Sequence, residues 1–391
     1  MVKRRLALFL DGTWNTVESA TNVSLLHGLV ADTDGEIAQL RYYDPGVGTG
    51  RLQGFRGGAF GFGLGRNVVE AYEWLVRNYR RGDEIYIFGF SRGAYTARSV
   101  AGLIAKCGLL HDLTEVGAAE LFGRYQKSAE MRPIYALKYL ARHGGDLTGE
   151  ERELLQVSRR VPIKMVAVWD TVGSLGIPFG NLPGLSRKRF RFHHTRLSNL
   201  FEHAYHALAI DEHRADFAPT TWTNFIPKVP DPPQPYARRK PIVEQRWFVG
   251  AHADVGGGSG NRLPLRAARW LAEKASAAGL RFRSLPEIPD DAKLEPVSDS
   301  FAAFMWGLYR LLKFNRRFHR VIGADPFDAG AGHVHGANET IDGSVFKRIR
   351  ADPQYEPPSL VEWAARRGVD IYAIAGDIDA GTGQPVAAAA S

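Results

Sequence analysis

Residues 85–102, IYIFGFSRGAYTARSVAG, constrain the fold of this chain more than any other stretch. The apolar run before Gly89 has the length and composition of a buried strand, and the run after Gly93 has the composition of a helix. Residues 89–93 join the two and match the pattern Gly-x-Ser-x-Gly. In this context the pattern is typical of a nucleophile elbow, a sharp turn that holds its serine in a strained conformation and exposes the hydroxyl. Both glycines are required there, because a Cβ would collide with the neighbouring strand or helix.

Four apolar runs of strand length predict the sheet around this turn: residues 5–10, 84–90, 163–169 and 245–251. Their hydrophobicity is continuous rather than alternating, which is typical of parallel strands that are covered on both faces. Helical patterns lie between the runs, for example at residues 67–79. The alternation of strand and helix predicts an α/β fold of the α/β-hydrolase type, doubly wound, with a mainly parallel sheet and helices on both faces.

The length of 391 residues allows one large domain. We expect a single catalytic domain over residues 1–375, with helical and loop insertions at about 110–160 and 285–345. The last stretch, 376–391, consists largely of small residues, and we expect it to be a disordered tail. The glycine-rich stretch 46–65 is typical of a backbone that wraps round a turn or a site rather than of regular structure.

Composition excludes several classes of protein. The formal net charge of +8 attracts anionic partners, but no zinc-finger, basic-zipper or RNA-recognition pattern is present, and we expect no nucleic acid ligand. One cysteine, Cys107, excludes an internal disulfide framework and a multi-cysteine metal site. No stretch approaches about 18 consecutive apolar residues, and the apolar part of MVKRRLALFL is too short for a signal peptide. We therefore expect a cytoplasmic protein, with any export by a route that needs no cleaved signal.

A nucleophilic serine predicts a histidine and an acid further along the chain, because its hydroxyl reacts at neutral pH only when a base takes the proton. Proteins with a nucleophile elbow have these groups in the order Ser, acid, His. Asp170 follows the apolar run 163–169, and His252 follows the run QRWFVG. Since the carboxyl ends of parallel strands meet at one edge of a sheet, we predict a triad of Ser91, Asp170 and His252.

Other histidines and carboxylates compete for these roles. His206 and His213 are alternatives for the base, but neither follows a strong strand pattern. Asp211 and Asp254 are alternatives for the acid. Asp211 lies in a segment of helical composition, and Asp254 is well placed to fix the glycine turn after His252. We favour Asp170 and His252, with Asp254 as structural support of the site.

The stretch LALFLDGTWN ends the first predicted strand with Asp11-Gly12-Thr13. The phosphatases of the haloacid-dehalogenase type end their first strand in Asp-x-Asp-Gly-Thr, but this chain has Phe9 at the position of the nucleophilic aspartate. We therefore predict that Asp11 supports the turn by hydrogen bonds to nearby backbone. The backbone N–H of Gly12 or Thr13 then joins the backbone N–H of Arg92 as a donor to the oxyanion.

Taken together, the motifs LFLDGTWN, GFSRGAYTARSVAGLI, VAVWDTVGSLG and WFVGAHADVGGG resemble the catalytic domain of the type VI secretion phospholipase effectors. HALAIDEHRADFAPTTW and the late GSVFKRI and YEPPSL resemble that family too, so the likeness covers about residues 4–362. The resemblance implies an α/β-hydrolase whose Ser-Asp-His triad falls, motif by motif, on Ser91, Asp170 and His252. It also implies hydrolysis of phospholipid acyl esters. We expect no cofactor and no metal.

We therefore expect a serine hydrolase of lipase or phospholipase type that acts on lipid or small esters. One alternative is a hydrolase fold that has lost catalysis and works as a binding module. Another is a metal-dependent phosphoesterase that uses Asp11, Asp170, Asp254 and His252 as ligands. The complete triad pattern favours the serine hydrolase over both.

The segment FAAFMWGLYRLLKFNRRFHRVIG, residues 301–323, combines apolar residues with a set of basic ones: Arg310, Lys313, Arg316, Arg317 and Arg320. We expect a helix, and two interpretations of it remain open. A helix that packs on the core and turns its basic residues to water is the favoured one. The other is an amphipathic helix that forms a lid or lies peripherally on an anionic membrane surface.

Overall fold

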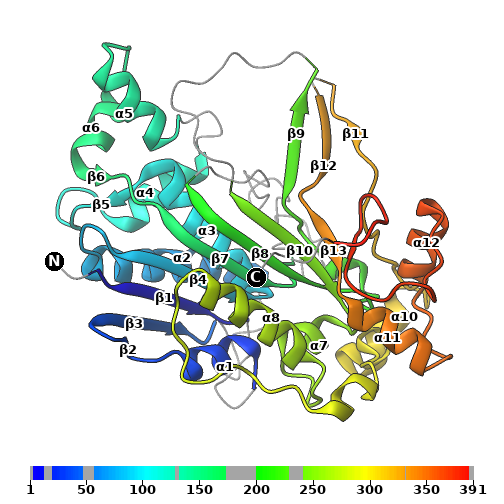
Figure 1. Cartoon of the computed structure of the whole chain (residues 1–391). Helices are drawn as coiled ribbons and strands as arrows, with labels where there is room; N and C mark the ends of the chain where they lie inside the picture. The colour runs from blue at the N-terminus through cyan, green and yellow to red at the C-terminus, as the bar shows by residue number, and fades with distance from the viewer. Residues whose placement is uncertain are drawn as a thin grey trace.

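A mainly parallel sheet forms the centre of the computed structural model, which describes residues 3–12, 20–46, 57–127, 132–172, 200–228, 241–330 and 332–386. Within these residues the nine strands of the sheet follow the order β14-β13-β10-β8-β7-β4-β1-β3-β2 (Figure 1). The parallel strands are β1 (Arg5–Leu10), β3 (Ile37–Asp44), β4 (Glu84–Phe90), β7 (Ile163–Trp169), β8 (Phe201–Ala209), β10 (Ile242–Phe248) and β13 (Glu339–Ile341). The edge strands β2 (Thr33–Asp34) and β14 (Ile378–Asp379) are antiparallel to their neighbours.

The strands are buried on both faces, which explains their continuous hydrophobicity. In β1, Leu6 and Leu8 belong to one core, and Ala7 and Phe9 belong to a second core on the opposite face. The first core includes residues of helices α2 (Gly57–Asn78) and α3 (Arg92–Cys107). The second includes residues of α1 (Asn22–Leu29) and α8 (Pro264–Ala277). The prediction of an α/β-hydrolase-like fold with helices on both faces is thus confirmed.

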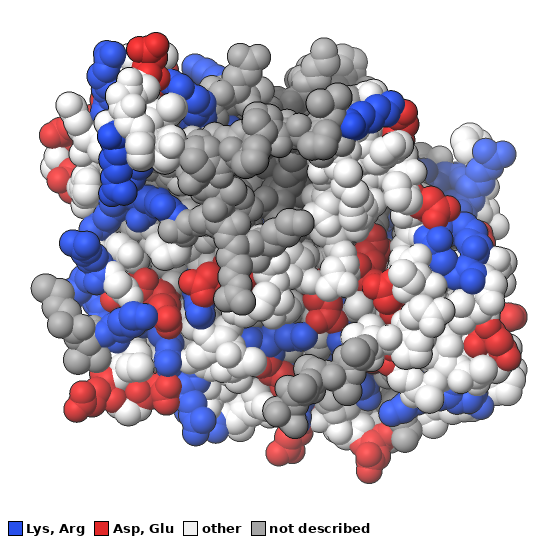
Figure 2. All heavy atoms as spheres, turned by 45° about the horizontal axis from the view of Figure 1, so that its top comes forward, with Lys and Arg blue, Asp and Glu red and all other residues white. Residues whose placement is uncertain are grey.

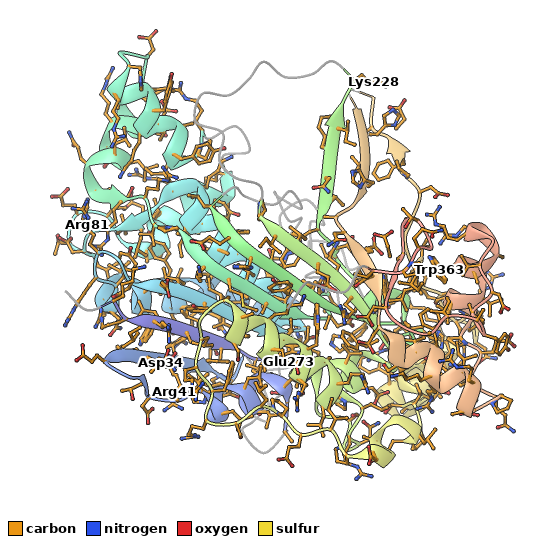
Figure 3. All side chains as sticks on the ribbon, in the orientation of Figure 1. Asp34, Arg41, Arg81, Lys228, Glu273 and Trp363 are labelled. Carbon is orange, nitrogen blue, oxygen red and sulfur yellow. The ribbon has the colours of Figure 1, made fainter. Side chains whose placement is uncertain are left out.

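Two groups of elements extend from this sheet (Figure 1). Helices α4 (Ala118–Lys127), α5 (Ile134–Arg142) and α6 (Gly149–Val157) follow one another in sequence between two short strands, β5 (Leu109–Leu110) and β6 (Ser158–Arg159), which pair with each other. A separate antiparallel sheet has the order β11-β12-β9, with β9 (Thr223–Pro227), β11 (Phe327–Asp328) and β12 (Gly332–Gly336). Lys228 lies at the outer end of β9 and pairs with Asp328 at 2.7 Å (Figure 3).

A third core lies at the β13 side of the sheet. It includes residues of α11 (Gly343–Ala351) and α12 (Pro358–Arg367), with Trp363 completely buried (Figure 3). Ile378 and Ala380 belong to the same core, and the indole N–H of Trp363 donates to the Ala380 carbonyl at 2.8 Å. The prediction of a disordered tail is therefore wrong for residues 376–386, and residues 387–391 lie outside the described part.

Residues 301–323 do not form one helix. The segment consists of α9 (Ser300–Ala303), the 3₁₀ turn η4 (Phe304–Gly307) and α10 (Leu308–Leu312), followed by irregular chain. Gly307 has a φ of 84° at the start of α10, and Phe314 has a φ of 50° after its end, so the helical path is broken on both sides. Both interpretations that assumed a single helix are wrong in that respect.

Three other expectations need correction. Residues 57–65 of the glycine-rich stretch are helical, because α2 begins at Gly57. The segment before Asp211 is the strand β8 rather than a helix. β13 lies within the insertion expected at 285–345 but belongs to the main sheet, so that insertion ends earlier.

No described helix, including the long α2, is apolar enough over its length to cross a membrane. On the face of the molecule in Figure 2, the described Lys and Arg residues are interspersed with Asp and Glu. The net positive charge is therefore not gathered into one area of that face.

Candidate active site

Ser91 lies in the sharp turn between β4 and α3 that the sequence predicts. Its backbone has a φ of 57° and a ψ of −119°, a conformation that costs a non-glycine residue about 1–3 kcal/mol. A Cβ on Gly89 would lie 2.5 Å from the Gly93 carbonyl oxygen, and a Cβ on Gly93 would lie 2.0 Å from that of Leu10. Neither position can accept a side chain without a shift of backbone, so both glycines are needed for the turn.

The side chains of Ser91, His252 and Asp170 lie in one hydrogen-bonded chain. Nε2 of His252 is 2.8 Å from Oγ of Ser91, and Nδ1 is 2.5 Å from Oδ2 of Asp170. Asp170 directly follows β7, and His252 begins the short helix α7 (His252–Gly256) after β10. Three parallel strands thus bring together residues that are far apart in sequence, at the expected edge of the sheet. The catalytic roles of the three stay a prediction.

Arg320 also binds Asp170, a contact that sequence reasoning missed. Its Nη1 donates to Oδ1 of Asp170 at 2.6 Å and its Nη2 donates to Oδ2 at 2.9 Å, and both side chains are fully buried. The same nitrogens donate to the carbonyls of Ala209 and Phe217. Burial raises the pKa of Asp170, but the charges of Arg320 and His252 and their hydrogen bonds hold it far below its ordinary value. Asp170 is therefore ionised at neutral pH.

No local pattern could have revealed Arg320. It is 150 residues from Asp170 in sequence, in the segment whose basic residues were expected to face water or lipid. The chain after α10 is irregular, so helical periodicity assigns Arg320 to no face.

Glu212 is a second buried carboxylate beside His252. Its Oε2 accepts from the backbone N–H of His252 at 3.3 Å, and Arg214 donates to both of its oxygens at 2.8 and 2.7 Å. Burial raises the pKa of Glu212, but the hydrogen bonds and charge of Arg214 outweigh this effect and lower the pKa to about 2. The guanidinium of Arg214 stacks on Phe217 at 3.5 Å, and the Phe217 ring meets the His252 ring edge-on at 5.2 Å. Glu212 thus supports the backbone of His252, and within the described residues it forms no hydrogen bond to the ring.

The alternative bases are engaged elsewhere. His206 lies in the middle of β8, where its Nε2 accepts from the backbone N–H of Thr171 at 3.0 Å. Burial, together with the charge of Arg98, lowers the pKa of His206 to about 3, so its ring is neutral. Nδ1 of His213 lies 3.1 Å from the carbonyl oxygen of Phe318.

The alternative acids hold turns of the backbone. Asp211 accepts from the backbone N–H of Gly250 at 2.7 Å and from the hydroxyl of Tyr355 at 2.8 Å. Asp254 accepts from the backbone N–H groups of Ala251 and Ser298, at 3.0 and 2.9 Å. Neither carboxylate contacts the ring of His252 through a hydrogen bond in the described residues. These contacts agree with the supporting role that we expect for Asp254.

Asp11 anchors the loop after β1. Its Oδ1 accepts from the backbone N–H of Gly12 at 2.7 Å, and its Oδ2 accepts from the hydroxyls of Thr21 at 2.5 Å and Tyr43 at 3.0 Å. The backbone N–H of Gly12, which we expected to face the oxyanion, therefore donates to Asp11. Thr13, the other residue expected in this role, lies outside the described residues.

The four residues of the metal-dependent alternative do not form a metal site. Within the described chain, no group of three or more His, Cys, Asp or Glu side chains is arranged to hold a metal ion. Asp170 has a guanidinium on both of its oxygens, while Asp11 and Asp254 accept hydrogen bonds from backbone N–H groups and hydroxyls around them. A permanent cation beside Asp170 opposes the binding of a second one by Coulomb repulsion.

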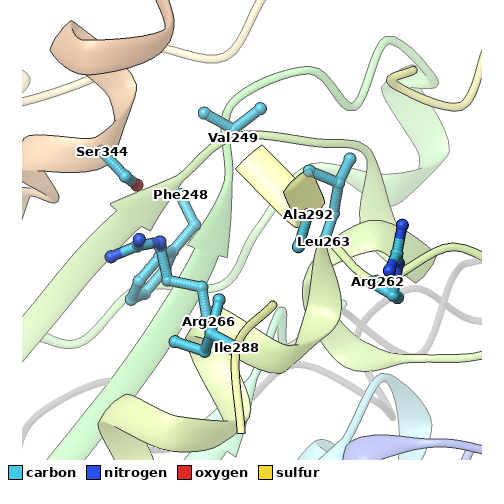
Figure 4. Close-up of a pocket in the computed structure, with 8 residues that line it drawn as sticks. All are labelled: Phe248, Val249, Arg262, Leu263, Arg266, Ile288, Ala292 and Ser344. Carbon is cyan, nitrogen blue, oxygen red and sulfur yellow. The ribbon is translucent and has the colours of Figure 1, made fainter. Parts of the chain in front are cut away.

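A small cavity of about 30 Å³ lies between the end of β10, the start of α8 and the start of α11. Figure 4 shows the residues that line it, among them Phe248, Leu263, Arg266 and Ser344. No triad residue lines this cavity, so it is separate from the site of Ser91.

The fold, and the serine in a tight turn after a central strand, place this chain among the α/β-hydrolase-like proteins. A family model described as "T6SS, Phospholipase effector Tle1-like, catalytic domain" matches residues 4–275. The chain therefore belongs to the Tle1-like catalytic-domain family of type VI secretion phospholipase effectors, and the resemblance predicted from the motifs is confirmed. The match begins before β1 and ends within α8, so it includes all three triad positions.

The individual proteins that match this chain have low sequence identity to it. An uncharacterised protein of Saccharomyces cerevisiae is 29% identical over 245 residues, which is 58% of this chain and 34% of the relative. The crystal structure of an uncharacterised protein from Pseudomonas aeruginosa is 18% identical, with 77% of this chain and 50% of the other covered and a TM-score of 0.44. The structure of the Tle1 effector bound to the VgrG spike is 17% identical, with 66% of this chain and 51% of the other covered and a TM-score of 0.33. The chain thus spans a third to a half of the length of these proteins.

Proposed function

We propose that this chain is a serine hydrolase that cleaves acyl ester bonds of phospholipids through an acyl-enzyme. The observation that carries the proposal is the position of His252, whose two ring nitrogens lie within hydrogen-bond distance of Ser91 and Asp170. This order of nucleophile, base and acid is the arrangement in which a histidine can take the proton of a serine hydroxyl. The phospholipase description of the family supports a lipid ester as substrate.

In the proposed reaction, Oγ of Ser91 attacks the ester carbonyl while Nε2 of His252 takes the hydroxyl proton. The tetrahedral intermediate collapses, the C–O bond to the alcohol breaks, and His252 returns the proton to the leaving oxygen. Water then attacks the acyl-enzyme with His252 as base, and the fatty acid leaves. Asp170 holds the imidazole in the required tautomer and stabilises its positive charge, and Arg320 keeps Asp170 ionised and in place.

The oxyanion needs donors that point at it before the reaction. The backbone N–H of Arg92 follows Ser91 at the first residue of the 16-residue helix α3, where the helix dipole favours negative charge. Gly12 can serve as second donor only if its amide leaves Asp11, so a role of the first loop requires this exchange or the amide of Thr13.

Substitution Ser91→Ala tests the proposal. Ser99→Ala is the matched control, because Ser99 is also buried and lies on α3, the helix that directly follows Ser91. Incubation with a phospholipid extract, followed by mass spectrometry, should yield lysophospholipid and fatty acid with the parent and with Ser99→Ala only. A fluorophosphonate probe should label the same two proteins. Labelling that persists in Ser91→Ala contradicts the assignment of the nucleophile. A parent protein that is folded but neither labelled nor active supports the binding module instead.

The description of the family also names the type VI secretion system. We extend the proposal to export by such an apparatus, which predicts that deletion of the apparatus in the producing cell keeps the protein inside. Recovery of equal amounts outside cells with and without the apparatus contradicts this extension.

A further inference from the structure

A short turn of the segment between α9 and Arg320 exposes apolar side chains that a folded protein would ordinarily bury. Leu311 is 69% exposed, Leu312 is 46% exposed and Phe314 is 87% exposed. They are neighbours in sequence at the end of α10 and just beyond it. We call residues 310–316 the docking tip, because large exposed apolar side chains that are close together favour a contact with a partner or a membrane.

The backbone of the docking tip holds Phe314 outward at a cost. Phe314 and Asn315 have φ values of 50° and 57°, a left-handed conformation that is unfavourable for residues other than glycine. Two hydrogen bonds close the turn, from the backbone N–H of Phe314 to the Leu311 carbonyl at 3.0 Å and from that of Asn315 to the Arg310 carbonyl at 2.9 Å. The turn thus has its own hydrogen bonds, and it leaves the ring of Phe314 in water.

Basic residues flank these apolar side chains in sequence. Arg310 and Arg316 are exposed, and neither forms an ion pair with any residue that the structure describes. Lys313, by contrast, pairs with Asp216 at 3.0 Å and Arg317 pairs with Asp299 at 2.6 Å. Two arginines that flank an exposed leucine and phenylalanine favour a surface that offers hydrocarbon and negative charge together, which is the interface of an anionic bilayer.

The docking tip is attached to the candidate active site. The hydroxyl of Tyr309 donates to Asp216 at 2.8 Å, and Lys313 binds the same carboxylate. Asp216 belongs to the 3₁₀ turn η2 (Ala215–Phe217), whose Phe217 ring contacts the ring of His252. A membrane bound at the tip is therefore held beside the wall of the site that contains His252.

We propose that the docking tip binds the surface of an anionic phospholipid membrane and so presents lipid esters to Ser91. The proposal rests on the proposed function for its choice of lipid as partner, since the substrate of a phospholipase lies in such a surface. Leu311 and Phe314 enter the hydrocarbon boundary, and Arg310 and Arg316 contact the lipid phosphates. A protein partner is the other occupant that the test distinguishes.

Binding is measured by sedimentation with phosphatidylcholine vesicles that contain about 30% phosphatidylserine, and with phosphatidylcholine alone. All proteins carry Ser91→Ala, so that the lipid is not consumed. Loss of Leu311 and Phe314 in the variant Leu311→Ser/Phe314→Ser should weaken binding to both vesicles by at least about tenfold. The variant Arg310→Gln/Arg316→Gln should lose about tenfold on anionic vesicles and little on neutral ones.

Matched controls remove similar groups elsewhere. Ile242→Ser/Tyr372→Ser changes two apolar side chains that are 58% and 53% exposed. Arg80→Gln/Arg81→Gln removes two exposed cations at the opposite side of the molecule, where Arg81 is labelled in Figure 3 and α10 is labelled in Figure 1. Both controls should bind vesicles like the parent. Binding that falls equally in the controls and in the tip variants overturns the proposal, because it shows no preference for the tip.

A soluble ester separates this proposal from the proposed function. With Ser91 restored, the tip variants should hydrolyse a short p-nitrophenyl ester at the parent rate and vesicle lipid more slowly. Unchanged vesicle binding by both tip variants overturns the membrane assignment and leaves the tip to a protein partner. If the parent hydrolyses no ester, the proposed function fails, while the binding measurement still decides the docking tip.

Discussion

Substitution Arg320→Met tests the arrangement of the candidate site most directly. Arg320 and Asp170 are both fully buried, and Arg320 supplies two of the hydrogen bonds that the carboxylate accepts. Methionine fills much of the same volume without charge, so the variant removes the cationic partner and two hydrogen bonds of a buried carboxylate. Removal of one partner of a buried ion pair costs about 3–5 kcal/mol, and we expect this loss of unfolding free energy at neutral pH.

The pH dependence gives a sharper readout than stability alone. In the parent, the folded pKa of Asp170 is below its unfolded value, so the pair stabilises the fold above the unfolded pKa, and this contribution is lost as the pH falls towards the folded pKa. In Arg320→Met the pKa of Asp170 rises, because burial is no longer opposed by the guanidinium. The stability deficit should therefore be largest at neutral pH and shrink as the pH falls to about 4. The acid limb of kcat/KM for a soluble ester should move to higher pH.

The assay combines urea unfolding at several pH values with the pH profile of ester hydrolysis. We expect kcat to fall about 10–100-fold as Asp170 loses its fixed position. Arg320→Lys keeps the charge without the bidentate contact, and it should give values between those of the parent and Arg320→Met in both measurements. Arg317→Met, on the same segment with a half-exposed ion pair to Asp299, should cost no more than about 1 kcal/mol. An unchanged acid limb in Arg320→Met, with stability within about 1 kcal/mol of the parent, refutes the reasoning.

Two further substitutions test the turns around the site. Asp11→Asn should keep near-normal ester hydrolysis, because an amide oxygen can still accept from the hydroxyls of Thr21 and Tyr43; a loss of more than about 100-fold in kcat at unchanged stability assigns Asp11 a direct role. Gly93→Ala should destabilise the fold by about 3 kcal/mol or more, since its Cβ would lie 2.0 Å from the Leu10 carbonyl oxygen. Gly123→Ala, in a helix with open space round the Cβ, should instead stabilise by about 0.5–1 kcal/mol, as thermal unfolding of both will show.

The parts of the fold that sequence predicts well are those decided locally. β1, β4 and β7 have the predicted bounds, because each is a continuous apolar run that ends at a polar turn. Asp170 was found by its place directly after β7, and His252 by its place after the apolar run of β10. Both inferences use one rule, that parallel strands deliver their carboxyl ends to a common edge.

The strand β8 was missed because its sequence, FEHAYHALA, carries polar groups that the fold accommodates individually. Glu202 is exposed at its start and pairs with Lys164 at 2.6 Å. His206 is buried in its middle, neutral and hydrogen bonded to the backbone of Thr171. A buried histidine of this kind depends on the partners that neighbouring strands supply, and those partners are not visible in its own stretch of sequence.

Three different environments receive the basic residues of the segment 301–323, although the sequence presents them as one set. Arg320 is buried against Asp170, Lys313 and Arg317 form partly exposed ion pairs, and Arg310 and Arg316 point into solvent. In a single helix, the position of each residue round the helix axis would decide whether it faces the core or solvent. The breaks at Gly307 and Phe314 remove that regularity. The environment of each arginine therefore depends on contacts with residues far away in sequence. Arg320 pairs with the acid of the candidate triad, whereas Arg310 and Arg316 stay exposed and can contact a membrane. The same breaks separate the two functions we assign to the segment, so the tip variants should leave the pH profile of soluble-ester hydrolysis unchanged, whereas Arg320→Met should shift it.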